Sequence, residues 1–247
     1  MQLSRDIELH IDNKLYTAPP CGGCRKMEVN SMRAGTLSLF PITIVLFAQF
    51  VAALSSVDQT AAASQEWKAL RPERSVVGQV LTSSAAPAIC IQVDSALPYI
   101  GGQRFILHDT VDAEQHFFLE VDKAKAIFRM YWIQFERFLP GRPGEYSYEY
   151  DKTVTFSGLK LLANVRRFIE PPAPDSDRKH AYEFLEKLGY PLPAPATRVR
   201  LVYLFEESRR QEVMIIYLEP AEIIGEVTAE ESAAIIQRAM QGITIGR

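Results

Sequence analysis

One segment of this chain, residues 34–57, contains no charged side chain and restricts the protein more than any other feature of its sequence. Its apolar part begins at Leu37 and reads LSLFPITIVLFAQFVAAL, and several small residues follow. An export signal needs an apolar run of roughly 7–15 residues before a small-residue cleavage site, and a membrane span needs about 20. The segment therefore indicates a chain that is directed to a membrane.

Three interpretations of this segment remain open. A cleaved signal fits if translation begins at Met32, because Arg33 then supplies the basic start and residues 51–53 and 61–63 are candidate cleavage sites. An uncleaved anchor is the second interpretation, although Pro41 weakens the segment as a permanent span. A helix buried in a protein core is the third.

The charges before the segment predict on which side of the membrane the rest of the chain lies. Arg25, Lys26 and Arg33 precede the segment, and only Glu28 stands against them. Positive charge favours the cytoplasmic side, so the C-terminal part is expected outside the cytoplasm in both membrane interpretations. It is then periplasmic or secreted, or tethered to the membrane through residues 34–57.

Composition divides the chain into four parts. The first is polar, and it indicates either a start placed too far upstream or a short tail whose Cys21 and Cys24 form a lone CxxC motif, a weak sign of metal or redox chemistry. The next three are the signal or anchor, a polar linker and a folded domain. The boundaries of the four parts are 1–31, 32–63, 64–84 and 85–247.

The folded domain has limited options for covalent stabilisation and for partners. Cys90 is its only cysteine, so it forms no internal disulfide and depends on its core. The whole chain has a net charge of −3 spread over mixed charges, which gives no basic footprint for nucleic acid.

From Ala85 on, short alternating or apolar runs are separated by Gly, Pro and Asp, which is the pattern of strands. Ser176 is expected to cap a helix that closes at Gly189, and a capping box begins at Thr228 before an apolar stripe. The predicted fold class is α+β: mostly antiparallel sheet, open or barrel-like, with one inserted helix and a C-terminal helix. Strands are expected over 89–93, 104–110, 116–122, 129–139, 146–150, 153–156, 198–206 and 212–219. Residues 159–169 suit a strand or a helix, and Val165 and Phe168 favour the strand.

The hairpin 104–122 offers a candidate metal site. A register that pairs Arg104 with Asp122 gathers the apolar side chains on one face. It places His108, His116 and Glu120 on the other face, where two imidazoles and a carboxylate suit a divalent metal. The alternative is that these three are ordinary polar residues on a solvated face.

The aromatic strand 129–139 offers a candidate ligand pocket. Its large side chains alternate between both faces, so we expect Trp132 and Phe135 to be buried on opposite sides of the sheet. Tyr131, Trp132 and Tyr148 are the candidates for lining an apolar pocket in which tyrosine hydroxyls orient a ligand. Plain core packing is the alternative.

The common catalytic motifs G-x-S-x-G, H-E-x-x-H, the P-loop and G-x-G-x-x-G are absent from the sequence. We therefore expect an exported or membrane-tethered domain without enzymatic activity. Its expected partner is an apolar small molecule or a protein of the cell envelope. The alternative is a metal-dependent enzyme centred on His108, His116 and Glu120.

Overall fold

The computed structural model describes residues 70–150, 152–168, 171–205, 207–222 and 225–246. The predicted leader segments 1–31 and 32–63 lie outside these residues. No helix within the described residues combines the length and the apolar character that crossing a membrane requires. The elements in chain order are β1 (Ser75–Val77), β2 (Val80–Ser83), β3 (Ile89–Val93), β4 (Tyr99–Leu107), β5 (Val111–Val121), β6 (Ile127–Phe138), β7 (Lys152–Phe156), β8 (Leu159–Phe168), α1 (Asp177–Lys187), β9 (Ala196–Phe205), β10 (Gln211–Pro220), α2 (Ala229–Gln241) and β11 (Ile243–Gly246).

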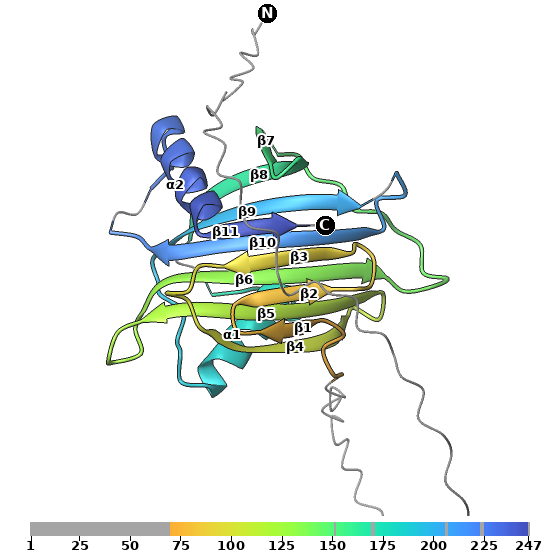
Figure 1. Ribbon diagram of the computed structural model, residues 1–247, viewed down its shortest axis with the longest axis horizontal. Helices are drawn as coiled ribbons and strands as arrows, with labels where there is room; N and C mark the ends of the chain where they lie inside the picture. The colour runs from red at the N-terminus through yellow and green to blue at the C-terminus, as the bar shows by residue number, and fades with distance from the viewer. Residues whose placement is uncertain (1–69, 151, 169–170, 206, 223–224, 247) are drawn as a thin grey trace, which may run out of the picture. The chain divides into compact units, whose positions relative to one another are not determined.

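Two antiparallel sheets contain all the strands of the described residues (Figure 1). The larger sheet has the order β4-β5-β6-β10-β9-β8-β7, and the smaller has the order β1-β2-β3-β11. The α+β class with mostly antiparallel sheet is therefore confirmed. The larger sheet is open, with β4 and β7 as its edges, so the barrel-like alternative is not what these residues form.

The larger sheet is covered on both faces, and β6 shows how. Its side chains alternate, so Tyr131 and Phe135 point to one face while Trp132 and Glu136 point to the other. The smaller sheet and α2 pack on the first face, which we call the sandwich face. Helix α1 and partly buried residues of the segments beside it pack on the second, which we call the α1 face.

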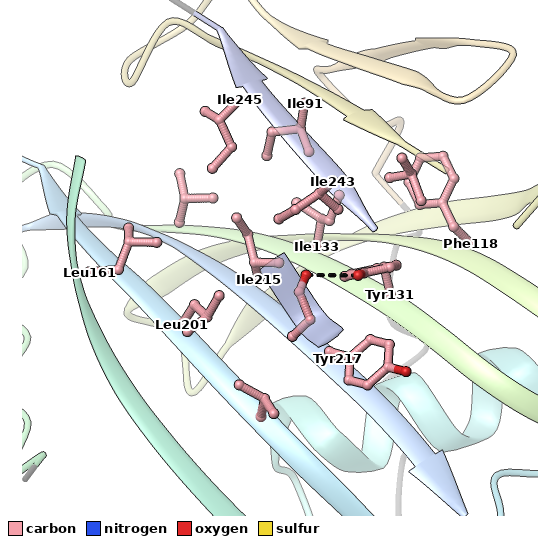
Figure 2. Packing of buried hydrophobic residues seen from close by; sticks show 14 of the residues in the cluster. Ile91, Phe118, Tyr131, Ile133, Leu161, Leu201, Ile215, Tyr217, Ile243 and Ile245 are labelled. Carbon is pink, nitrogen blue, oxygen red and sulfur yellow. Dashed lines mark hydrogen bonds between the residues drawn. The ribbon is translucent and has the colours of Figure 1, made fainter. Parts of the chain in front are cut away.

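The sandwich face holds the larger apolar core (Figure 2). The Tyr131 hydroxyl donates a hydrogen bond of 2.7 Å to the carbonyl of Ala239, which fixes α2 to the centre of the sheet. Side chains from both sheets meet here, with β3 and β11 on one side and β6 and β10 on the other. Examples are Ile91, Ile243, Ile245, Ile133 and Ile215.

The prediction that both faces of the aromatic strand are buried is confirmed. Trp132 is 3% exposed on the α1 face and Phe135 is 2% exposed on the sandwich face. Strand β6 lies between β5 and β10 in the middle of the sheet, and layers of packed residues cover both of its faces. A sheet with one face in water would need polar residues at every second position of the strand, and this strand largely lacks them.

Both helices begin where the sequence predicts. The Ser176 hydroxyl accepts the N–H of Lys179 at 3.1 Å, and α1 ends before Gly189, whose φ of 80° favours glycine. Thr228 and Glu231 cap α2 reciprocally, with bonds of 3.2 and 2.8 Å.

The predicted register of the first hairpin is wrong. The sequence pattern pairs Arg104 with Asp122, whereas in the structure Arg104 lies opposite Glu114. The chain turns earlier, at His108 and Asp109, whose φ angles of 51° and 53° are both left-handed. A tight turn of this kind fits the twist of a hairpin, and it lets β5 include the residues that were expected to form the turn.

The cause of this error is that polar side chains in β5 are buried with partners. Asp112 accepts hydrogen bonds from Arg104 at 2.8 and 2.7 Å and from Arg137 at 2.9 Å, and it is only 7% exposed. A polar run usually marks a turn, but these ion pairs let it continue a covered strand.

Two further expectations need correction. The linker expected over 64–84 contains β1 and β2, so the folded domain includes residues from Leu70 on. Residues 146–150 form no strand; they run along the α1 face as an irregular segment, and the Tyr146 N–H donates to the Arg209 carbonyl at 2.8 Å.

Candidate functional site

The structure does not bring the predicted metal ligands together. His108 is exposed in the β4–β5 turn, His116 is 1% exposed on the sandwich face, and the Glu120 carboxylate pairs with the Arg129 guanidinium. The site depended on the register that proved wrong. Among the described residues, no group of three or more His, Cys, Asp or Glu side chains is placed to hold a metal ion.

His116 instead belongs to a buried network. Its Nε2 atom lies 2.7 Å from the Glu114 carboxylate and its Nδ1 atom 3.1 Å from the Tyr99 hydroxyl. Glu114 also accepts the backbone N–H groups of Glu73 and Arg74 at 2.8 and 2.9 Å. Burial alone would raise the pKa of Glu114, but these hydrogen bonds outweigh it and lower the pKa to about 2. The network fastens the segment before β1 to the large sheet.

The predicted pocket residues fall on two faces. Tyr131 is fully buried on the sandwich face, whereas Trp132 and Tyr148 both belong to the cluster on the α1 face. Tyr131 and Trp132 therefore do not line one pocket. Two hollows of about 170 and 310 Å³ lie elsewhere, and both include Arg167 and Glu219 among their lining residues.

The α1 face holds a pair of buried glutamates that the sequence analysis missed. Glu136 of β6 lies directly opposite Glu212 of β10, and the two are 8% and 0% exposed. Residues opposite each other on antiparallel strands have Cβ atoms about 4.5–5.5 Å apart. Burial, and then the negative charge of Asp177, raise the pKa of Glu136 to about 7. Burial, and then the negative charge of Glu136, raise the pKa of Glu212 to about 8.

Polar side chains from three elements surround this acid pair. The Tyr148 hydroxyl donates to both carboxylate oxygens of Glu212, at 2.6 and 2.8 Å. The Gln134 amide donates to Glu136 and, at 3.2 Å, to Asp177 in the first turn of α1. The segment 146–150, the strand β6 and the helix α1 therefore meet over the pair. The raised pKa values favour the protonated forms of the two carboxyl groups.

Two arginines of β9 lie on the same face. Arg198 and Arg200 are two residues apart, so they point to the same side of the sheet. Arg200 donates to the Tyr150 hydroxyl at 3.3 Å and lies 3.9 Å from the Asp177 carboxylate. Both arginines are partly buried. We call Tyr148, Tyr150, Asp177, Arg198, Arg200 and the acid pair together the α1-face site.

The sequence did carry a signal for this site. Gln134 and Glu136 occupy alternate positions of a strand whose neighbours are aromatic, so they point to the same side as Trp132. A polar residue at an inward position of a strand covered on both faces needs a partner and marks a network. The partner Glu212 lies far away in the chain, so the pairing of the two glutamates could not be predicted from the sequence.

Comparisons of this chain with protein-family models, with curated proteins and with solved structures found no match. The fold and the site define an α+β domain of two antiparallel sheets with an ionisable cluster under α1. The chemistry of that cluster is therefore the evidence that bears on function.

Proposed function

We propose that this chain is a non-catalytic binding domain that acts outside the cytoplasm, and that it takes a small molecule at the α1-face site. The observation that carries the proposal is a pair of tyrosines beside an arginine. The rings of Tyr148 and Tyr150 lie 5.0 Å apart, and both residues are partly exposed. Arg200 bonds the Tyr150 hydroxyl.

Such an arrangement suits ligand binding. Tyrosine rings offer apolar contact area, and their hydroxyls and a guanidinium orient polar groups of a ligand. Glu212 holds the Tyr148 hydroxyl through two hydrogen bonds, so the ring is positioned before a ligand arrives. A side chain that is already held in place reduces the entropic cost of binding. The apolar part of the expected ligand then rests on these rings, since Trp132 is almost entirely buried.

The proposal is non-catalytic because of where the reactive groups lie. Glu136 and Glu212 have the pKa values of acid–base catalysts, but they are 8% and 0% exposed beneath Tyr148 and α1. A general acid or base must come within hydrogen-bond reach of the group on which it acts. No observation favours the metal-dependent alternative.

The location outside the cytoplasm is supported by sequence alone. The uncharged segment 34–57 and the basic residues before it favour export or tethering of the rest of the chain. The single cysteine in the exported part fits an envelope protein that relies on its core. A protein of the cell envelope is the competing occupant of the α1-face site.

Native mass spectrometry of the full chain, recovered from the envelope of the cells that make it, tests the proposal. We expect a bound small molecule whose mass disappears under denaturing conditions. Tyr150→Ala should lose it, and Phe128→Ala, which truncates an aromatic that is 56% exposed elsewhere on β6, should keep it. A ligand retained by Tyr150→Ala, a protein cross-linked at the site in its place, or the absence of any bound species would contradict the proposal.

A further inference from the structure

Arg198 and Arg200 leave N–H groups without acceptors inside the α1 face. The Nε atoms of both are buried and have no hydrogen-bond partner among the described residues. No carboxylate of those residues lies within 4 Å of the Arg198 guanidinium, and Asp177 approaches Arg200 only to 3.9 Å. Buried arginines normally fork onto a carboxylate or phosphate with two short bonds, and neither of these does.

Like charges crowd Arg198, and Asp177 and Tyr150 offset them only in part. Arg166 lies directly opposite Arg198 across β8 and β9. Arg178 of α1 is near enough to Arg198 to disfavour its charge; its own guanidinium donates to the Pro171 carbonyl at 2.9 Å. Burial, and then the positive charge of Arg200, lower the pKa of Arg198 to about 10. A desolvated charge among like charges destabilises a fold unless it is paired.

A third unused donor lies on the same face. The Trp132 indole N–H is buried without an acceptor, and its residue is 3% exposed. Trp132 and Arg200 are the two cross-strand neighbours of Ile216, so they flank it in one row across the sheet. Buried donors are almost always satisfied, so three unsatisfied donors on one face favour a ligand that supplies acceptors.

We propose that the ligand of the α1-face site carries an oxyanion, which seats between the guanidinium groups of Arg198 and Arg200. This inference rests on the proposed function and names the chemistry of its ligand. Alternate residues on a strand lie about 7 Å apart, so two guanidinium forks rise from one strand on the same side of the sheet, where one oxyanion can accept from both. The Tyr150 hydroxyl, beside Arg200, gives the ligand a further polar contact.

The test is thermal unfolding of the full chain against inorganic phosphate, with ionic strength held constant by chloride. A ligand that binds only the folded state raises the melting temperature as its concentration rises. We expect a rise of several degrees for the wild type. Arg198→Met should remove the response to phosphate and, because it removes an uncompensated charge, should raise the melting temperature in chloride alone. Arg142→Met, at an exposed arginine of the β6–β7 connection, should keep the wild-type response.

Calorimetric titration with phosphate measures binding by the wild type directly, whether or not Arg198→Met folds. Arg198→Lys keeps the charge but loses the fork, so we expect at least tenfold weaker binding than wild type. Glycerol phosphate and vesicles of phosphatidylglycerol separate the sources of the oxyanion. Binding of glycerol phosphate without vesicle binding identifies a soluble ligand, and vesicle binding that requires Arg198 identifies a lipid headgroup.

Some results would overturn the inference. One such result combines two observations: Arg198→Met lowers the melting temperature in chloride, and phosphate does not change the melting temperature of the wild type. Together they would mean that another group of the chain neutralises Arg198. Asp151 and Glu170 lie outside the described residues, so Asp151→Asn and Glu170→Gln test whether one of these carboxylates neutralises Arg198. If phosphate raises the melting temperature of either variant but not that of the wild type, the inference is wrong. A Tyr150-dependent ligand in native mass spectra together with no response to phosphate would leave the proposed function standing and this inference refuted.

Discussion

Replacing Glu212 with glutamine should make the protein more stable at high pH. Burial and the charge of Glu136 raise the pKa of Glu212 from 4.5 to about 8 in the folded protein. A raised pKa in the folded state contributes stability that is fully present below pH 4.5 and is lost as pH rises through 8. Wild-type stability should therefore fall across this range. The glutamine amide stays neutral and still accepts the Tyr148 hydroxyl, so the variant should lack that part of the fall.

The size of the effect follows from the shift. One pKa unit corresponds to about 1.4 kcal/mol, so a shift from 4.5 to about 8 is worth up to about 5 kcal/mol at pH 9. Glu136 titrates with Glu212 as a coupled pair, and relaxation of the site reduces the penalty, so we expect about 3–5 kcal/mol. At pH 5 wild type and variant should agree within about 1 kcal/mol.

Urea denaturation of the full chain at pH 5, 6, 7, 8 and 9, followed by tryptophan fluorescence, measures both free energies of unfolding. Glu149→Gln is the matched control, because it removes an exposed carboxylate from the neighbouring segment and should not change the slope with pH. A wild type whose stability stays flat from pH 5 to 9 would refute the reasoning. So would a Glu212→Gln protein that is less stable than wild type at pH 9.

Trp132→Ala and Phe135→Ala should each lower the free energy of unfolding by about 3–5 kcal/mol in urea denaturation, because both rings are buried on opposite faces of β6; a harmless change at either would contradict the packing. Glu114→Gln should cost about 3–5 kcal/mol at pH 7 by leaving Arg74 buried without its carboxylate. Because the pKa of Glu114 is lowered to about 2, that difference should vanish as pH falls from 4.5 through 2. Alkaline phosphatase joined by a linker to Arg247 should be active if the domain lies outside the cytoplasm, and inactive phosphatase with an active cytoplasmic reporter would reverse that assignment.

Local sequence signals predicted the elements well. β3 occupies the predicted residues 89–93, and Ser176 and Thr228 cap the two helices as expected. These features depend on neighbours within a few residues, such as a side-chain oxygen that reaches the third N–H of its helix. The burial of Trp132 and Phe135 followed from the alternation along one strand.

Features that depend on distant partners were not predictable. The register of the first hairpin depended on whether the polar side chains of β5 had buried partners. Arg74 is the partner of Glu114, and it lies in a segment that was expected to be a linker. The metal hypothesis used the wrong register and failed to gather its residues for that reason. The pairing of Glu136 with Glu212 needed the order of strands in the sheet, which no local pattern contains.

The two buried networks on the large sheet point to different roles because their charges are compensated differently. On the sandwich face Glu114 receives enough hydrogen bonds that its pKa falls to about 2, which is the behaviour of a group with its partners in place. On the α1 face burial raises the pKa of Glu212 to about 8 and lowers the pKa of Arg198 to about 10, so it disfavours the charged form of the acid and of the base alike. Groups with such opposed shifts concentrate at functional sites, because a fold selected for stability alone would satisfy or remove them. The sandwich-face network therefore fastens the fold, whereas the α1-face site is where we propose that a ligand binds.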